Sequence, residues 1–137
     1  MSKFESSDAW MFLSIAYSAQ DRPATLDELY AAADHINCAI PTHEEIQGGI
    51  NRLASAGLVR VEEGRFTLSD LGRQMFDRVC RQTPYPRIQP ELIEQQLRSA
   101  RFSVVAHISW DLSASESDAA LSRYHKRMKD ALRKIRG

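Results

Sequence analysis

The sequence predicts a mainly α-helical chain of the α+β class with one small β-hairpin. The stretches TLDE, from Thr25, and THEE, from Thr42, are capping boxes, in which a threonine hydroxyl and a glutamate carboxylate each accept a hydrogen bond from a free amide at a helix start. Two short apolar runs, 58–61 and 65–68, flank the residues EEG, which predicts two strands joined by a tight turn. Farther along, apolar residues recur at steps of three or four and predict a last amphipathic helix.

The first two helices are expected on either side of the break DRP. Residues 8–19 are apolar nearly all round, which predicts a mostly buried helix, and Ser6 or Ser7 is its expected N-cap. The Thr25 box opens a second helix that runs to about Ile36.

The Thr42 box opens a third helix, on which Ile46, Ile50 and Leu53 share one face. Gly57 is suited to the position just past the end of this helix. Gly64, between the two predicted strands, can adopt a positive φ at low cost.

A fourth helix is expected over residues 70–80, with Ser69 as its N-cap. Its predicted apolar stripe consists of Leu71, Met75, Phe76 and Val79. Three prolines then interrupt regular structure, so residues 82–90 are expected to form a linker or an ordered crossing loop. These signals divide the chain into a first domain over residues 1–81 and a C-terminal extension over residues 91–137.

The extension begins with a helix predicted over residues 91–100. Residues 100–112 fit both the alternation of a strand and the stripe of a helix, and we expect an extended segment there. The stretch SESD, from Ser115, is a weak capping box that opens the last helix, which runs to about Lys134.

The predicted order of helix, helix, helix, hairpin and helix matches a known arrangement. The stretch LASAGLVRVEEGRFTLSDLGRQ resembles the recognition-helix end, wing and following helix of winged helix-turn-helix regulators of the MarR and PadR families. The residues that carry this resemblance are Ala56, Gly57, Leu58, Val59, Gly64, Phe66, Leu68, Ser69 and Gly72. Residues 33–53 also look like uncharacterised bacterial winged-helix proteins. The resemblance covers about residues 8–81 and implies a winged helix-turn-helix fold with a C-terminal helical extension.

In such a fold the third helix enters the major groove of double-stranded DNA and the hairpin lies along the backbone. Gln47 and Asn51 lie four residues apart on one helix face, and each could contact adenine with two hydrogen bonds, while Arg52 could reach phosphate or guanine. The predicted DNA-binding residues are His43, Gln47, Asn51, Arg52, Arg60 and Arg65.

Other residues of the same region count against DNA binding. Glu44 at the helix start and Glu62 and Glu63 at the hairpin tip place negative charge where phosphates would lie, which opposes the electrostatic term of DNA affinity. Gly48 and Gly49 each destabilise a helix interior by roughly 1 kcal/mol relative to alanine. Their presence predicts a close approach by another group, most readily a neighbouring helix.

The net charge of zero hides an uneven distribution. Residues 1–86 carry eight Lys and Arg against twelve Asp and Glu, whereas residues 87–137 carry ten against six. The predicted basic patch on the last helix includes Arg123, Lys126, Arg127, Arg133 and Lys134. The apolar stripe of this helix is formed by Leu121, Tyr124, Met128, Leu132 and Ile135. Such a stripe packs on its own domain or on a symmetry mate, and the resemblance implies a homodimer formed through it.

Neither an enzyme nor a cofactor is predicted. The sequence has no glycine-rich phosphate loop and no G-x-S-x-G elbow, and the spacing of His35, Cys38 and His43 matches no structural zinc pattern. We expect Cys38 and Cys80 to be buried free thiols in a reducing cytoplasm. No apolar run reaches the roughly 18 residues that a membrane span requires.

Two functions remain open at this point. The leading one is DNA binding by a transcription regulator, and the alternative is a winged helix that docks proteins without binding DNA. A regulator predicts tighter DNA binding after Glu44→Gln, whereas a docking module predicts no change.

Overall fold

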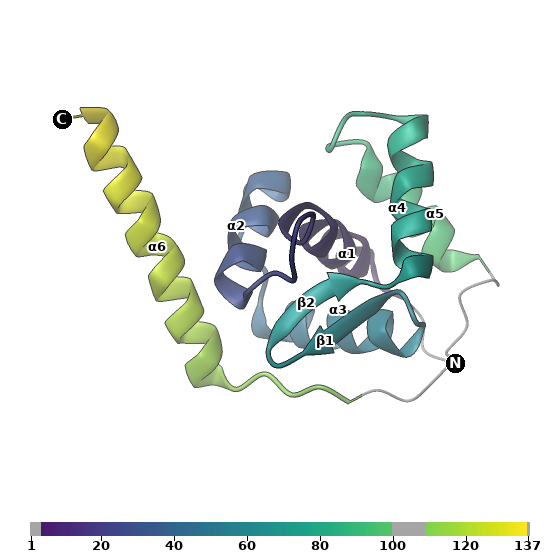
Figure 1. The fold of residues 1–137 in the computed structure, drawn as a ribbon, viewed down its shortest axis with the longest axis horizontal. Coiled ribbons are helices and arrows are strands. Elements are labelled where there is room, and N and C mark those ends of the chain that lie inside the picture. The colour runs from purple at the N-terminus through teal and green to yellow at the C-terminus, as the bar shows by residue number, and fades with distance from the viewer. Residues whose placement is uncertain (1–3, 100–108, 137) are drawn as a thin grey trace.

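The computed structural model describes residues 4–99 and 109–136, and within these ranges it contains six helices and one two-stranded sheet. The elements are α1 (Ser6–Ser18), α2 (Leu26–Asn37), α3 (His43–Ser55), β1 (Val59–Glu62), β2 (Arg65–Leu68), α4 (Asp70–Gln82), α5 (Gln89–Arg98) and α6 (Ala114–Arg136). Figure 1 shows α1 among α2, α3 and α5, with most of α6 standing apart from the body of the molecule. The predicted class, helices with a small antiparallel sheet, is confirmed.

Helix α1 is the central helix, and every residue from Asp8 to Ala16 is buried. A helix that is apolar on all sides is stable only when other elements cover it all round. The helix begins with Glu5 as its N-cap, so the predicted serine caps were wrong. The Asp8 carboxylate accepts a hydrogen bond from the Glu5 amide at 2.9 Å, and the Ser6 hydroxyl donates to Glu94 instead.

The two predicted capping boxes both form. The Thr25 side chain accepts from an amide in the first turn of α2, and the Thr42 side chain does the same in α3. The three apolar residues predicted to share one face of α3 are fully buried: Ile46, Ile50 and Leu53. Gly57 follows the end of α3 with a φ of 77°, the left-handed conformation that its predicted role requires.

The hairpin has a two-residue turn, in which Glu63 and Gly64 both have positive φ, at 52° and 72°. Two positive φ angles define the turn type whose twist matches that of paired strands. One residue from the loop before α2 extends this sheet, because Ala24 and Phe66 exchange both backbone hydrogen bonds, at 2.8 and 2.9 Å.

Helix α4 begins after Ser69, whose hydroxyl accepts from the amide of Gly72. A Cβ on Gly72 would lie 2.1 Å from the carbonyl oxygen of Leu58, so α4 can pack this closely on the start of the hairpin only with glycine there. Met75, Phe76 and Val79 are buried as predicted. Leu71 is 43% exposed, so its place in the predicted stripe was wrong; it lies at the outer margin of the packed face.

The proline-rich segment is an ordered crossing loop, and α5 already begins at Gln89. The Gln89 side chain is buried, accepts from the Tyr17 hydroxyl and donates to the Thr83 carbonyl at 3.1 Å. Ile93 and Leu97 are buried in the common hydrophobic core. The first helix of the predicted extension therefore packs on α1 and α4.

The last helix, α6, begins at Ala114, directly after its N-cap. Glu116 donates its amide to the Ser113 hydroxyl at 3.1 Å, so Ser113 is the N-cap and the predicted cap at Ser115 was wrong. Residues 109–113 form neither helix nor strand. The rest of the ambiguous run, residues 100–108, lies outside the described residues.

Both cysteines are free thiols. Cys38 is exposed, so its predicted burial was wrong; it occupies the left-handed position after α2, with a φ of 50°. Cys80 is half-buried, where desolvation raises the pKa of its thiol.

Candidate functional site

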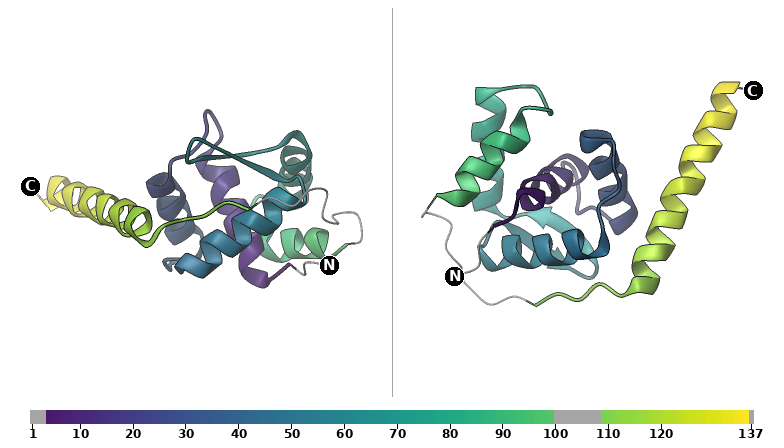
Figure 2. Two further views of the ribbon diagram at one scale, coloured as in Figure 1. Left: turned by 90° about the horizontal axis from the view of Figure 1, so that it is seen from below. Right: turned by 180° about the vertical axis from the view of Figure 1, so that it is seen from behind.

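The outer face of α3 is covered by residues 109–113, here called the strap. Gln47 accepts a hydrogen bond through Oε1 from the Leu112 amide at 2.8 Å. Asn51 binds Trp110 twice: its Nδ2 donates to the Trp110 carbonyl at 2.8 Å, and its Oδ1 accepts from the Trp110 amide at 2.6 Å. Figure 2 shows this chain segment passing along α3 before it reaches α6. Two of the predicted base-reading side chains are thus bound to the chain's own backbone.

Apolar contacts hold the strap as well. The Trp110 ring meets the ring of Phe66 edge to face, with centroids 5.3 Å apart and an interplanar angle of 87°. This is a favourable geometry for an aromatic pair. Leu112 is only 4% exposed and belongs to the hydrophobic core. The strap therefore joins α3 to the hairpin across the surface that the resemblance assigned to DNA.

Arg52 is bound to α1. Its Nε and Nη2 atoms donate to the two carboxylate oxygens of Asp8 at 2.7 and 2.8 Å, and Asp8 is fully buried. The pKa of the guanidinium is raised above its ordinary value, first by these hydrogen bonds. Arg52, the third α3 residue predicted to contact DNA, therefore neutralises the buried carboxylate of Asp8.

The two glycines of α3 have separate neighbours. A Cβ on Gly49 would lie 3.1 Å from an Asp8 carboxylate oxygen and 3.1 Å from Met11, so this glycine permits the close approach of α1. A Cβ on Gly48 would meet the guanidinium of Arg52 at 3.1 Å. The approach of a neighbouring helix, predicted from these glycines, is confirmed at Gly49.

The other predicted DNA contacts lie at the start of α3 and on the hairpin. His43 is half-buried at the start of α3, and Arg60 and Arg65 are exposed on the hairpin. The exposed residue of α3 is Glu44, and the hairpin ends in two further exposed glutamates. What α3 and the hairpin tip present to solvent is therefore largely acidic.

The foot of α6 is bound to α2 by polar contacts. The hydroxyls of Tyr30 and Ser117 share a hydrogen bond of 2.6 Å, and the Tyr124 hydroxyl donates to Asp34 at 2.6 Å. Burial, followed by this hydrogen bond, raises the pKa of Tyr124 to about 12. Asp27 forms ion pairs with Arg123 and Arg127 on the same side of the contact: Arg123 lies 3.5 Å away, and Arg127 also donates a hydrogen bond.

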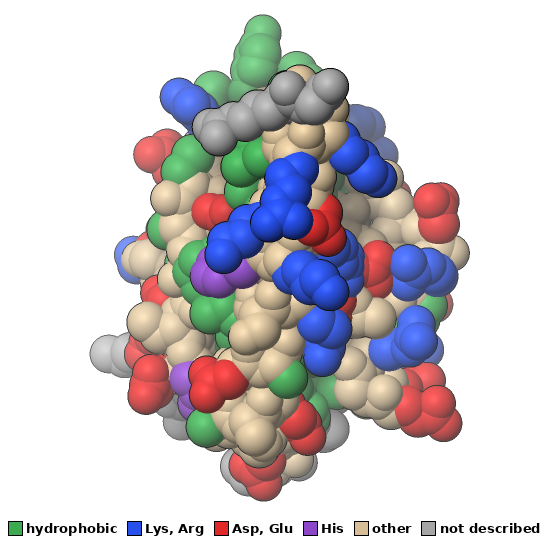
Figure 3. All heavy atoms as spheres, turned by 90° about the vertical axis from the view of Figure 1, so that its left-hand side faces the viewer, with side chains coloured by type: hydrophobic (Ala, Val, Ile, Leu, Met, Phe, Trp, Pro, Cys, Tyr) green, Lys and Arg blue, Asp and Glu red, His purple; other side chains and the backbone are tan. Residues whose placement is uncertain are grey.

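Beyond Tyr124 the helix leaves the body of the protein, apart from the pair of Arg127 with Asp27. We call residues 125–135 the arm; every one of them is exposed. The distal half of the predicted apolar stripe lies here, with Met128 44%, Leu132 50% and Ile135 81% exposed, whereas Tyr124 is buried against α2. Figure 3 shows Lys and Arg side chains gathered along this helix.

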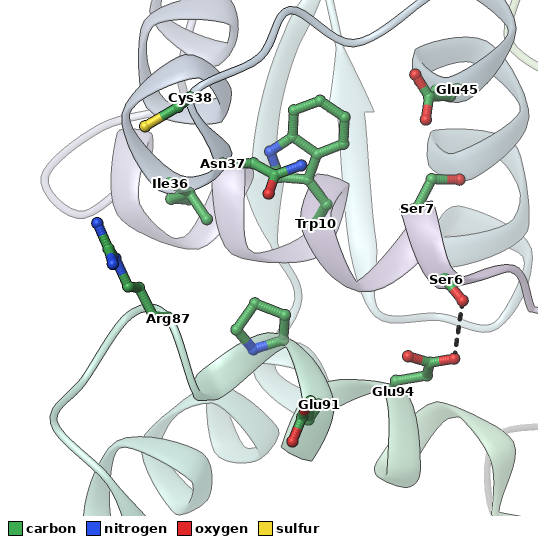
Figure 4. Close-up of a pocket in the computed structure, with 11 residues that line it drawn as sticks. Ser6, Ser7, Trp10, Ile36, Asn37, Cys38, Glu45, Arg87, Glu91 and Glu94 are labelled. Atoms are coloured by element: carbon green, nitrogen blue, oxygen red, sulfur yellow. Dashed lines mark hydrogen bonds between the residues drawn. The ribbon is translucent and has the colours of Figure 1, made fainter.

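A groove of about 530 Å³ lies between α1, the end of α2 and α5. Figure 4 shows Trp10 of α1 beside Ile36 of α2, with Glu91 and Glu94 of α5 on the opposite side of the groove. The groove also contains Glu45, Pro90 and one basic residue, Arg87. Nothing in the sequence marked these residues as neighbours, because they come from four separate segments.

Comparisons of the chain with protein-family models, with curated proteins and with solved structures found no match. Within the described ranges, no helix has both the length and the apolar character needed to cross a membrane. The same residues contain no group of three His, Cys, Asp or Glu side chains that could hold a metal ion.

Proposed function

We propose that this chain is a winged-helix protein of the docking class, which contacts other protein surfaces through α6 and does not read DNA bases through α3. The order α1, α2, α3, β1, β2, α4 supports the winged-helix assignment. The Ala24–Phe66 pairing adds support, because it brings the loop between α1 and α2 alongside the hairpin as a short third strand.

The observation that carries the proposal is the use of the α3 side chains within the chain. An amide side chain reads adenine only when both its oxygen and its nitrogen are free to bind the base edge. Both of these atoms of Asn51 are bound to Trp110, and the oxygen of Gln47 is bound to Leu112. Arg52 is held by Asp8. Base reading by α3 would require breaking all of these contacts.

Electrostatics support the same conclusion. Affinity for a DNA backbone comes largely from Lys and Arg side chains that displace counterions from phosphates. The exposed residue at the start of α3 is Glu44, and the exposed hairpin tip carries Glu62 and Glu63. These carboxylates would repel the phosphates that a winged helix must approach.

The arm supplies the positive part of the proposal. An exposed apolar stripe bordered by charged side chains is typical of an interaction surface rather than of ordinary solvent-facing helix. Met128, Leu132 and Ile135 form such a stripe, and they continue the face through which Tyr124 packs on α2. A partner that covers this face would extend an interface that the chain already uses.

Titration of a labelled generic duplex with the protein, at low salt and at two higher salt concentrations, tests the proposal. The docking proposal expects that Glu44→Gln and Arg60→Ala leave any measured DNA affinity unchanged. A matched control, Arg133→Ala with Lys134→Ala, reports non-specific attraction by the arm. Tighter binding by Glu44→Gln together with weaker binding by Arg60→Ala would contradict the proposal.

A second candidate function is DNA binding by a regulator, and one observation favours it. Arg60 and Arg65 are both exposed on the hairpin, where a wing would contact a phosphate backbone. This candidate requires the strap to leave α3, so it predicts that Asn51→Ala, which weakens the strap, changes DNA affinity. The docking proposal predicts no such change.

A further inference from the structure

We propose that the arm of one molecule docks in the α1–α5 groove of a second copy of this chain. This inference rests on the proposed docking function and names its partner. The arm and the groove carry complementary charge and apolar surface.

The arm offers an apolar stripe with a strong positive charge around it. Its apolar side chains are Met128, Leu132 and Ile135, which lie at the i, i+4 and i+7 positions of one helix face. The basic residues of the arm are Lys126, Arg127, Lys129, Arg133 and Lys134, against one acidic residue, Asp130. Among the described residues, only Arg127 of these five has an ion-pair partner.

This charge disfavours the partner that the family resemblance implied, a second α6. Side-by-side packing of two such arms would bring ten basic side chains together and leave only two acidic ones to offset them. Like charges at a helix interface oppose association and select against that pairing. The arm requires a partner surface that is apolar and acidic.

The groove has that composition. Trp10, Ile36 and Pro90 supply apolar surface. Three carboxylates line the groove, from Glu45, Glu91 and Glu94, against one basic side chain from Arg87. Glu45 accepts the Thr42 amide in the capping box of α3, and Glu94 accepts from Ser6 and pairs with Arg98. Glu91 is exposed and has no ion-pair partner among the described residues, so it is free to meet a cation.

The contact has to form between two molecules. The arm is the straight continuation of a helix whose foot is fixed to α2, and it points away from the body in each view of Figures 1 and 2. At 1.5 Å per residue it extends roughly 16 Å beyond Tyr124. Reciprocal exchange of arms would use the same two surfaces on both copies and would close as a two-fold dimer.

Sedimentation velocity of the full chain at low and high salt tests the proposal. The expected result is a dimer at low salt that dissociates as salt screens the ion pairs. Two variants reverse one surface each: Arg133→Glu with Lys134→Glu on the arm, and Glu91→Lys with Glu94→Gln in the groove. Each variant alone is expected to weaken the dimer by about tenfold or more, and an equimolar mixture of the two is expected to dimerise again.

Arg60→Glu, on the exposed hairpin, is the matched control and is expected to dimerise like the wild type. Circular dichroism and the thermal midpoint establish that each variant is folded. A wild-type chain that is monomeric at low salt would overturn the proposal. So would a groove variant that dimerises normally, because that result would assign the contact to pairing of two arms. Neither outcome bears on the duplex titration, so failure of this inference is distinguishable from failure of the docking function.

Discussion

The buried carboxylate of Asp8 depends on one arginine for its charge balance. Asp8 has no exposed surface, and its two oxygens receive the Nε and Nη2 hydrogens of Arg52 and the amide of Glu5. A buried charge that loses its partner is strongly destabilising, since the remaining ion has neither water nor a counter-charge. Arg52 therefore contributes to the stability of the α1–α3 contact.

The corresponding variant is Arg52→Ala. We expect it to lower the free energy of unfolding by about 3–5 kcal/mol, because it leaves the Asp8 carboxylate buried and uncompensated. Urea denaturation at neutral pH measures the change. Arg60→Ala removes an exposed arginine and is expected to stay within about 0.5 kcal/mol of the wild type. Equal stability of the two variants would show that the Asp8 pair adds nothing to the fold.

Tyr124 gives a pH-dependent prediction for the foot of α6. Its pKa is raised from 10.0 to about 12, by burial and then by the hydrogen bond to Asp34. Because the folded pKa is the higher one, the stabilisation is complete below pH 10 and is lost as pH rises towards 12. The stability difference between wild type and Tyr124→Phe should therefore be constant from pH 7 to about 10 and shrink above it. A difference that is independent of pH up to 12 would contradict the assignment.

At the scale of segments, two side chains of α3 hold the strap, and each accepts a hydrogen bond from a different backbone amide of the strap. Asn51→Ala removes the acceptor of the Trp110 amide, and Gln47→Ala removes the acceptor of the Leu112 amide. Loss of a partner for a buried amide typically costs about 1–3 kcal/mol. Hydrogen exchange at each amide should accelerate by about tenfold or more in its own variant. The Phe66 amide, bound to Ala24, serves as the unaffected control, and acceleration there would mean that the whole sheet had opened.

The helices and the hairpin were predictable because their signals are local. A capping box or a turn with positive φ is decided by residues within one turn of each other, and both threonine boxes formed as expected. The caps of α1 and α6 were predicted wrongly because more than one nearby residue could serve as the N-cap. Ser113 and Ser115 each precede an acidic residue by three positions, and the burial of Leu112 brings the helix start to Ser113. The capping pattern alone does not predict that Leu112 is buried, so it could not distinguish the two serines.

The candidate site was predictable only in part, for the same reason. Helical spacing correctly placed Gln47 and Asn51 together on one face of α3, but it could not reveal what covers that face. Their partners, Trp110 and Leu112, lie about sixty residues farther along the chain. Packing of the last helix on its own domain was one of two alternatives left open, and Tyr124 follows it, but the sequence did not indicate α2 as the partner. Asp27, Tyr30 and Asp34 share one face of α2, and this polar face was the signal for that contact.

For the molecule as a whole, opposite charges are separated along the chain and in space. The first 86 residues have a balance of −4 and the remainder +4, and much of the positive charge lies on the exposed residues of the arm. A neutral molecule with separated charges attracts other copies of itself more readily than one of large net charge. The separation therefore favours contacts between copies of the chain.

A chain that ends at Tyr124 tests whether the arm serves association between molecules and not the stability of the fold. It lacks six basic residues and one acidic residue, so its net charge falls from zero to −5. Because residues 125–135 are exposed, we expect the free energy of unfolding in urea to stay within about 1 kcal/mol of the wild type. This range allows for the loss of the part-buried pair of Arg127 with Asp27, which keeps Arg123 as a partner. Sedimentation should show a monomer at every salt concentration.

A chain ending at Ser113 is the matched control, because it also loses the contacts between the foot of α6 and α2. Its free energy of unfolding should be lower than that of the wild type by about 2 kcal/mol or more. If ending the chain at Tyr124 destabilised the fold as much as ending it at Ser113, the arm would be part of the core rather than a surface for a partner.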